Sequence, residues 1–405
     1  MIKLALRNLL RHRRRTVITL TAISFGVIAL LLVGGFIEWA FWGMREGVIQ
    51  SRLGHIQMTR YGYFESGSAD PFSYLLSEEL EEQIELETFK EIEVVSQRLA
   101  VAGLISHDDL TVGFIGEGVD PEKDANLSKH LFITTGKNLA TDDPNGVLLG
   151  GGLAENLGVT VGDTVVLLVT PESGGLNGIE CTVRGLFHTA SKEFDDVAMR
   201  LPLGSARQLL RTSGSHTWVI LLDETERTDA VLQQLRAQYQ GGGNQVQFTP
   251  WYTLADFYNK TKKLFSRQMN MVRLVIALII ILGISNTLVM SVLERTGEIG
   301  TLMAIGYKRK QILRLFINEG FLLGAIGGGI GVVAGVVLAK IISVIGIPMP
   351  PPPGMEVGFS GKIMLTWSLA AGALVLALVT TVLGSIYPAW KASRLEIVDA
   401  LRHNR

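Results

Sequence analysis

The residues that could perform chemistry are few, and their spacing matches no nucleotide-binding pattern. The phosphate-binding pattern G-x-x-x-x-G-K-[ST] is approached only at Gly361-Lys362-Ile363, which lacks both the upstream glycine and the hydroxyl. Gly150-Gly151-Gly152 precedes a predicted short helix, but Glu155 stands where the dinucleotide-binding pattern G-x-G-x-x-G needs its third glycine. We therefore predict no catalytic residues and no ATP hydrolysis by this chain.

Metal and acid–base chemistry have equally little support. The seven histidines show no i, i+4 pairing, and the single cysteine, Cys181, excludes an intrachain disulfide and a multi-cysteine metal site. His188, Glu193 and Asp195 form the one local cluster with acid–base potential, although an ordinary polar loop explains it better. We predict no metal site and no directly bound cofactor.

The composition points to a membrane protein. The 405 residues are 47% hydrophobic and 19% charged, with a mean hydropathy of +0.32 and a formal net charge of −1. This balance excludes a globally basic nucleic-acid-binding protein. Four uncharged windows are long enough to cross a bilayer as helices: 16–37, 274–293, 320–339 and 363–390. The first is too long for the apolar core of a signal peptide.

The basic residues set the expected orientation. Residues 1–15, 294–319 and 391–405 are rich in Lys and Arg, whereas 346–362 contains only Lys362, so both termini are expected in the cytoplasm. The predicted fold is an integral membrane α-helical protein with four transmembrane helices and a large extracytoplasmic α+β domain between the first two. The segments are a cytoplasmic amphipathic segment 1–15, first span 16–42, outer domain 43–265, second span 266–293, cytoplasmic segment 294–314, third span 315–345, outer loop 346–362, fourth span 363–390 and cytoplasmic tail 391–405.

Apolar alternation and helical periodicity divide the outer domain into elements. Ile179, Cys181 and Val183 share one strand face, so Cys181 is expected to be buried. Predicted strands are 55–59, 165–169, 179–187 and 218–222, and predicted helices begin at Ser77 and cover 203–211 and 228–239.

A single helix is predicted from about Thr253 to Leu293, because Gly283 is the one glycine between Trp251 and Thr296 and no proline interrupts the pattern. Such a helix would transmit displacement from the outer domain to Glu294. The alternative is a break at the membrane surface between Arg267 and Arg273.

The third window contains a nearly bare helix face. Its glycines allow close helix approach, either to another subunit or within the chain. They are Gly324, Gly327, Gly328, Gly331 and Gly335. Glu319, just before this window, is either a functional intramembrane carboxylate or an ordinary group facing the inner headgroups.

The stretch ERTGEIGTLMAIGY at 294–307 resembles the E-R-x-x-E-I-G-x-x-x-A-x-G segment of FtsX/MacB-type ABC transporter permeases. ALRNL at 5–9 and the tail from Tyr387-Pro388-Ala389 to Arg402 resemble the terminal motifs of that family. In the outer domain, GHIQ at 54–57 and VLLG at 147–150 resemble the lipoprotein-releasing LolC/LolE branch.

The resemblance implies a permease of the bacterial inner membrane with a MacB-like periplasmic core domain. Two permeases, identical or different, would assemble with a cytoplasmic ABC ATPase that binds ATP-Mg, and mechanotransmission would move the outer domains to extract or export a lipoprotein or other amphiphile. The residues matching the coupling segment are Glu294, Arg295, Glu298, Ile299, Gly300, Met303 and Gly306.

Two other functions stay open at this stage. An FtsX-like signal unit would use the same stroke to activate an extracytoplasmic enzyme, and a stand-alone receptor would need no ATPase. One departure from the lipoprotein-releasing branch concerns residues 170–178, where the family can form a hook for a periplasmic carrier. This segment has no basic residue and is rich in glycine, which puts carrier recruitment in doubt.

Overall fold

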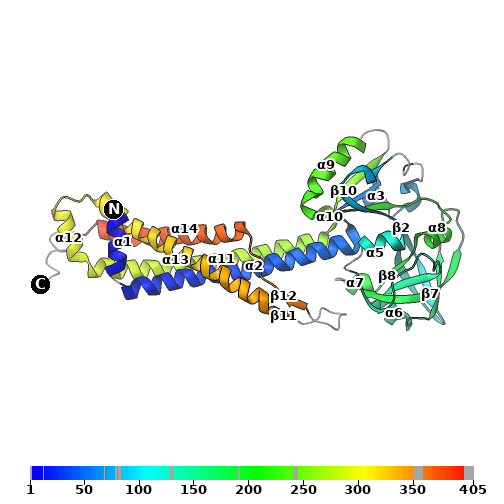
Figure 1. Ribbon diagram of the computed structural model, residues 1–405, viewed down its shortest axis with the longest axis horizontal. Helices are drawn as coiled ribbons and strands as arrows, with labels where there is room; N and C mark the ends of the chain where they lie inside the picture. The colour runs from blue at the N-terminus through cyan, green and yellow to red at the C-terminus, as the bar shows by residue number, and fades with distance from the viewer. Residues whose placement is uncertain are drawn as a thin grey trace. The chain divides into compact units, whose positions relative to one another are not determined.

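A computed structural model of the chain describes residues 2–11, 13–67, 69–77, 80, 84–127, 131–189, 192–239, 245–349 and 359–395. The chain divides into two compact units (Figure 1). The helical unit comprises Met1–Trp42, Thr261–Met349 and Ser360–Arg405, and the α/β unit comprises Gly43–Lys260 and Pro350–Phe359.

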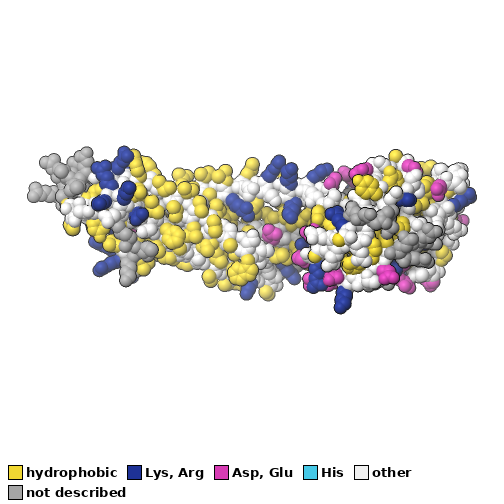
Figure 2. Space-filling view, turned by 90° about the horizontal axis from the view of Figure 1, so that it is seen from above, with side chains coloured by type: hydrophobic (Ala, Val, Ile, Leu, Met, Phe, Trp, Pro, Cys, Tyr) yellow, Lys and Arg dark blue, Asp and Glu magenta, His cyan; other side chains and the backbone are white. Residues whose placement is uncertain are grey.

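The helical unit is built around four helices that are long and apolar enough to cross a membrane, as the sequence predicts. They are α2 (Arg13–Val48), α11 (Asp256–Glu294), α13 (Arg309–Ile345) and α14 (Trp367–Ser393). Two short helices, α1 (Ile2–Arg11) and α12 (Thr296–Ala304), accompany them, with the strands β11 (Ile347–Met349) and β12 (Phe359–Gly361). Hydrophobic side chains cover much of the visible face of this unit, and Lys and Arg gather at the end that carries α1 and α12 (Figure 2).

The glycine face of α13 packs within the chain. A Cβ added to Gly331 would lie 2.7 Å from the Val27 side chain of α2, and one on Gly335 would lie 2.6 Å from Leu31. On the same side, the Ser24 hydroxyl donates a 2.8 Å hydrogen bond to the carbonyl of Gly327. The absence of side chains therefore lets α2 approach the α13 backbone directly.

The second set of glycines on α13 faces α14. Gly324 packs against Thr381, and a Cβ on Gly328 would lie 2.8 Å from Leu374. Of the two partners that the sequence leaves open for the glycine face, the structure thus provides one in its own helices α2 and α14.

The predicted long helix begins slightly later than expected. Ala255 has φ −85° and ψ 60°, so the first turn forms a separate helix, α10 (Trp251–Leu254), and α11 starts at Asp256. From there α11 runs without interruption to Glu294, and the alternative break between Arg267 and Arg273 does not occur.

The α/β unit contains a ten-stranded sheet of order β10-β1-β9-β2-β3-β8-β5-β7-β4, with β6 pairing with β2 and β7. The pairings β2-β3-β8-β5-β7-β6-β2 close a ring, because the long strand β2 serves both β3 and β6. The strands are β1 (Ile56–Arg60), β2 (Ile92–His107), β3 (Leu110–Val119), β4 (Phe132–Gly136), β5 (Gly146–Gly150), β6 (Thr164–Val169), β7 (Asn177–His188), β8 (Ala198–Pro202), β9 (Thr217–Leu222) and β10 (Val246–Pro250).

Helices cover the sheet on two sides and provide two hydrophobic cores. One core joins the ring to α6 (Gly151–Leu157) and α8 (Leu203–Leu210), and the other joins β1, β9 and β10 to α9 (Thr228–Tyr239). The remaining elements are the π-helical turn η1 (Ile49–Leu53), the 3-10 turns η2 (Pro71–Tyr74), η3 (Leu86–Thr88) and η4 (Thr225–Arg227), and α3 (Tyr63–Ser66), α5 (Pro121–Leu127) and α7 (Lys192–Asp195).

The strands and helices predicted in this unit are confirmed as β1, β6, β7, β9, α8 and α9. Most of the helix expected after Ser77 falls outside the described residues. Cys181 is buried between Ile179 and Val183 as predicted, and burial raises the pKa of its thiol to about 12.

Candidate coupling site

The cytoplasmic segment predicted from the sequence forms the short helix α12 between α11 and α13. Arg295 interrupts the chain of helical residues with φ −112° and ψ 17°, so α12 turns away from α11. After α12, Gly306 adopts φ +105°, a conformation that only glycine tolerates readily. The backbone N–H of Lys308 then donates to Gln311 Oε1 at 2.7 Å, which caps the start of α13.

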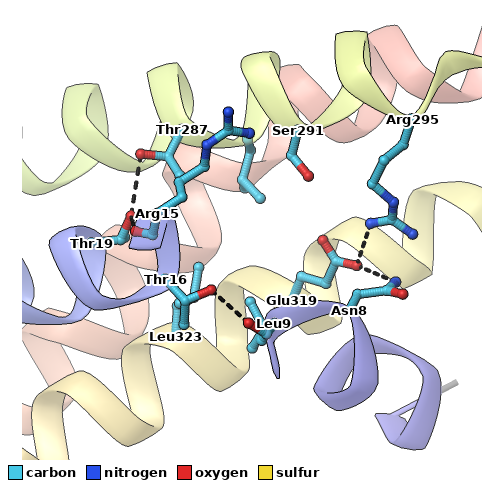
Figure 3. Close-up of a pocket in the computed structure, with 11 residues that line it drawn as sticks. Asn8, Leu9, Arg15, Thr16, Thr19, Thr287, Ser291, Arg295, Glu319 and Leu323 are labelled. Carbon is cyan, nitrogen blue, oxygen red and sulfur yellow. Dashed lines mark hydrogen bonds and ion pairs between the residues drawn. The ribbon is translucent and has the colours of Figure 1, made fainter. Parts of the chain in front are cut away.

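A buried ion pair fixes α12 to the rest of the helical unit (Figure 3). Arg295 Nη1 lies 3.1 Å from Glu319 Oε1 of α13, and the two side chains are 6% and 2% exposed. The same carboxylate oxygen accepts a 2.7 Å hydrogen bond from Asn8 Nδ2 of α1. Glu319 therefore holds three elements at one point, because a buried carboxylate is stable only when its oxygens are paired.

A second carboxylate, Glu298, holds Arg295 from the outer side. Its Oε2 lies 3.1 Å from Arg295 Nε, and its Oε1 lies 2.7 Å from Arg11 Nη1 of α1. Burial alone would raise the pKa of Glu298, but the hydrogen bonds and charges of Arg295 and Arg11 outweigh it and lower the pKa. Glu298 is thus held ionised while 42% of its side chain stays exposed.

A cavity of about 30 Å³ lies beside the Arg295–Glu319 pair, large enough for one or two water molecules. Thr16, Thr19, Thr287 and Ser291 line it, as Figure 3 shows. Arg15 also lines it and forms an ion pair with Glu294 at the end of α11. Polar side chains therefore continue from the ion pair into the interface between α2 and α11.

The predicted coupling residues divide into a buried set and an exposed set. Arg295, Ile299, Gly300 and Met303 are buried, and both apolar side chains belong to the hydrophobic core of the helical unit. The apolar side chains of Ile299 and Met303 therefore face the chain's own helices and are not available to a partner. The exposed members of the predicted set are Glu294, Glu298 and Gly306.

Two residues that sequence reasoning missed complete the exposed face. Thr301 and Ile305 are exposed, and Ile305 shows 74% of its surface. They follow Glu298 at i+3 and i+7, which is the spacing of one helix face. That period could have separated the outer face from the inner one, since Arg295, Ile299 and Met303 follow the same period one position later.

A second buried network lies in the α/β unit, at the end of η1. Arg98 Nη1 donates to the carbonyl of Arg52 at 2.6 Å, and Arg200 Nη2 donates to the carbonyl of Ser51 at 2.7 Å. Carbonyls at a helix end have no partner in the helix itself. Two arginines from β2 and β8 thus tie the last turn after α2 to the sheet.

Two carboxylates neutralise these arginines. Asp124 of α5 bonds Arg98 at 2.8 Å and Arg200 at 2.9 Å. Glu117 of β3 lies 3.2 Å from Arg98 and 3.5 Å from Arg52. Burial would raise the pKa of Glu117, but the charges of Arg98, Arg52 and Arg200 lower it further than burial raises it.

His55 connects the same end of α2 to β9 and η4. The backbone N–H of Leu222 donates to His55 Nδ1 at 2.9 Å, so this nitrogen is unprotonated, and Nε2 lies 2.9 Å from Thr225 Oγ1. Thr225 in turn donates to Glu46 Oε1 of α2 at 3.0 Å. Burial lowers the pKa of His55 to about 4, so the ring is neutral near pH 7.

In the cluster of His188, Glu193 and Asp195, the side chain of Asp195 holds a loop in place. Asp195 is buried and accepts bonds from the Thr189 backbone N–H at 2.9 Å and hydroxyl at 2.7 Å. Its other neighbour, His188 Nδ1, is 3.6 Å from the carboxylate. Asp195 therefore closes the loop after β7.

Comparison with known proteins follows the two units. The MacB-like periplasmic core domain family matches residues 16–238, and the FtsX-like permease C-terminal family matches residues 270–397. An uncharacterised ABC transporter permease of Methanocaldococcus jannaschii is 25% identical over 290 residues, which cover 67% of this chain and 65% of that relative. The lipoprotein-releasing system transmembrane protein LolC of Xylella fastidiosa is 27% identical over 305 residues, covering 68% of this chain and 69% of LolC.

Among solved structures, the periplasmic region of MacB from Actinobacillus actinomycetemcomitans aligns with a TM-score of 0.37 at 12% identity, covering 51% of this chain and 94% of that region. The two family matches decide the assignment of this chain. The MacB-like family covers more than half of the 405 residues, and the FtsX-like family covers most of the remainder. The chain therefore belongs to the ABC transporter permeases with FtsX-like and MacB-like domains.

Proposed function

We propose that this chain is the permease subunit of an ABC transporter that works by mechanotransmission, with ATP hydrolysed by a separate cytoplasmic ATPase. The observation that carries this proposal is the two-sided helix α12. Its inner side is locked by Arg295 and Glu319, while Glu298, Thr301 and Ile305 offer an exposed side to a partner.

The buried side of α12 explains how a displacement of this helix would be transmitted to the rest of the helical unit. A flexible loop would absorb the displacement of a partner, whereas α12 has its apolar residues in the core shared with α11, α13 and α14. Ile299 and Met303 are 1% and 8% exposed, so α12 cannot shift without moving its neighbours. The continuous helix α11 then carries the displacement away from the site.

The proposed orientation places α12 and both termini in the cytoplasm of a bacterial cell and the α/β unit in the periplasm. The excess of Lys and Arg in 1–15, 294–319 and 391–405 supports it, since positive residues favour the cytoplasmic side. The permease would act as a pair, and the substrate would be a lipoprotein or another amphiphile, in line with the name of the LolC relative.

Recruitment of a periplasmic carrier is not part of the proposal. The segment between β6 and β7, where a hook would lie, turns through Gly174 and Gly175, which have φ +74° and +80°. Leu176 is 70% exposed there, but no basic residue is available to hold an acidic partner.

The proposal is tested by changing two exposed residues, Ile305 and Glu298, of which Glu298 also pairs with Arg295 and Arg11. Ile305→Asp and Glu298→Lys should abolish stimulation of the partner ATPase by the full-length permease, because a charge would be forced into the contact. Lys391→Ala, an exposed change on α14, is the matched control and should keep full stimulation. Normal stimulation by both α12 variants would refute coupling through this helix.

A further inference from the structure

The exposed side of α11 contains a polar group that a bilayer cannot satisfy. Asn286 lies within the uncharged window 274–293, eight residues before Glu294, or about 12 Å along the helix axis. Its side chain is exposed, and within the described part of the chain its amide has no hydrogen-bond partner. A primary amide facing hydrocarbon without a partner is costly, since lipid tails offer neither donors nor acceptors.

The next residue along α11, Thr287, does have partners. Thr287 donates to the carbonyl of Gly283 at 2.8 Å and bonds Thr19 of α2 at 3.2 Å. Those contacts lie on the side of α11 that faces the rest of the helical unit. Asn286 lies about 100° around the helix from Thr287 and is exposed, and a Cβ added to Gly283, about 60° from Asn286, would have no neighbour within 4 Å.

The residues around Asn286 follow the spacing of a helix-pairing seam. Apolar side chains recur at alternating intervals of three and four along the free side of α11, with Asn286 taking one place in the series. This is the heptad pattern by which two helices pack, and a single Asn in it sets the register of the pair. The seam is Val272, Val275, Ile279, Leu282, Asn286, Val289 and Leu293, of which all but the half-buried Val289 are exposed.

We infer that this seam is the contact between α11 of one permease subunit and α11 of a second copy of this chain, with the two Asn286 amides bonded to each other. Two copies inserted in the same orientation are related by an axis along the membrane normal, which places identical residues at the same depth. An amide has both a donor and an acceptor, so Asn286 is complementary to itself. No other class of partner is needed to satisfy it.

The free surface of α11 is large enough for such a contact. Only 28% of its most apolar window is buried within the chain, against 44% for α2 and 33% each for α13 and α14. The glycines of α13 already pack on α2 and α14, whereas the exposed Asn286 of α11 has no hydrogen-bond partner in the described part of the chain. The inference rests on the proposed pairing of two permeases, but not on docking of α12 to an ATPase.

Disulfide crosslinking of the full-length chain in membranes tests the contact, with Cys181→Ser as background. Asn286→Cys and Leu282→Cys should form covalent dimers on oxidation. Leu274→Cys is the matched control, since it is similarly exposed but about 120° around the same helix from Asn286, and it should stay monomeric. Equal crosslinking at Leu274, or none at Asn286, would overturn the assignment.

A second variant separates this inference from the proposed function. Asn286→Leu should weaken association of labelled subunits, followed by energy transfer in dilute bilayers, by roughly three- to thirty-fold, the range measured for interhelical polar contacts. Unchanged association, or crosslinking that needs a different permease chain, would refute pairing with a second copy. The crosslink should persist in Ile305→Asp even when ATPase stimulation is lost, so each proposal can fail alone.

Discussion

The chain has a buried arginine–carboxylate network in each unit, and each network holds the end of a long helix. In the helical unit, Arg295 follows the end of α11 and pairs with Glu319. In the α/β unit, Arg98 and Arg200 hold the last carbonyls of η1, which continues α2.

The two networks differ in how completely they are closed. Asp124 is enclosed between the buried Arg98 and Arg200, and the second carboxylate of this network, Glu117, is only 20% exposed. Arg295 keeps a second carboxylate, Glu298, which is 42% exposed, and a small polar cavity lies beside it. We infer that the closed network is a fixed joint, whereas the open one can rearrange when a partner binds α12.

Asp124→Ala should therefore have the largest effect on stability. Two buried guanidinium groups would lose their shared partner, and breaking a buried pair costs about 3–5 kcal/mol. Hydrogen–deuterium exchange of the full-length protein should show this loss in β2 and β8, with much less change in α13. Glu122→Ala, an exposed change on the same helix α5, is the control, and a similar effect of both variants would contradict a fixed joint.

The α/β unit should also respond to mild acid through His55. The folded-state pKa of about 4 lies below the ordinary value of 6.5, so the unfolded state takes up a proton first as the pH falls. Stability is complete above pH 6.5 and should decline toward pH 4, by on the order of 3 kcal/mol. Exchange rates in β1 and β9 measured across this range should show the decline.

The variant His55→Asn provides the control for this pH response. His55→Asn keeps an acceptor for the Leu222 N–H but cannot be protonated, so the profile of β1 and β9 should flatten. Helices α11 and α13 contain no histidine and serve as the internal reference. An equal decline in the variant would show that a group other than His55 causes the response.

Glu319→Gln should cost less than Asp124→Ala. The amide keeps the shape and one bond to Asn8 or Arg295, and Glu298 still neutralises Arg295. The expected loss is about 1.5–3 kcal/mol, the contribution of a hydrogen bond to a charged group. Exchange in α12 and α13 measures it, together with stimulation of the partner ATPase.

Glu294→Gln is the matched control for Glu319→Gln. It changes another carboxylate near the same site, but one that is 43% exposed and paired only with Arg15 among the described residues. Its stability loss should stay below about 1 kcal/mol. If Glu294→Gln were as costly as Glu319→Gln, burial would not be what distinguishes these two acids.

Much of the helical unit could be predicted because hydropathy is a local property. Four uncharged windows correspond to four long helices, and the lack of proline, with Gly283 as the one glycine, predicted the continuous α11. The exact start was missed, since Ala255 leaves the helical conformation through its surroundings and has no helix-breaking side chain.

The α/β unit was less predictable, because its strands depend on distant partners. The sixteen-residue β2 was not predicted, as its first half pairs with β9 and its second half with β3 and β6. Arg98, Asp124 and Arg200 come from three separate elements, so no spacing in the sequence shows that they meet. A local pattern cannot reveal such a network, although charged residues inside apolar strands are a signal worth testing.

The coupling site was less predictable than the helical unit and more predictable than the α/β unit. The resemblance grouped Arg295, Ile299 and Met303, which are buried, with Glu294 and Glu298, which are exposed. Helical period alone would have separated the two sides and added Thr301 and Ile305. Whether each residue of this set contributes to coupling is still a prediction.

The smallest expected effect concerns the Arg11–Glu298 pair on the outer side of the open network. Its atoms are 2.7 Å apart, but the side chains are 68% and 42% exposed, and solvent screens such a pair. A double-mutant cycle with Arg11→Ala and Glu298→Ala should give a coupling free energy of about 0.2–1 kcal/mol. Because the pKa of Glu298 is lowered, this small term is present above the ordinary pKa and fades as the pH falls through the folded value below 4.5.

The same cycle decides whether the open network is an anchor or a surface for the partner. If Glu298 serves mainly the partner, Glu298→Ala should reduce ATPase stimulation strongly while the stability of α12 changes little, and Arg11→Ala should change both only slightly. A coupling free energy above about 2 kcal/mol would instead make Arg11–Glu298 a structural pair comparable to Arg295–Glu319. The two networks would then be equally closed, and the proposed freedom of α12 to rearrange would have no basis in its ion pairs.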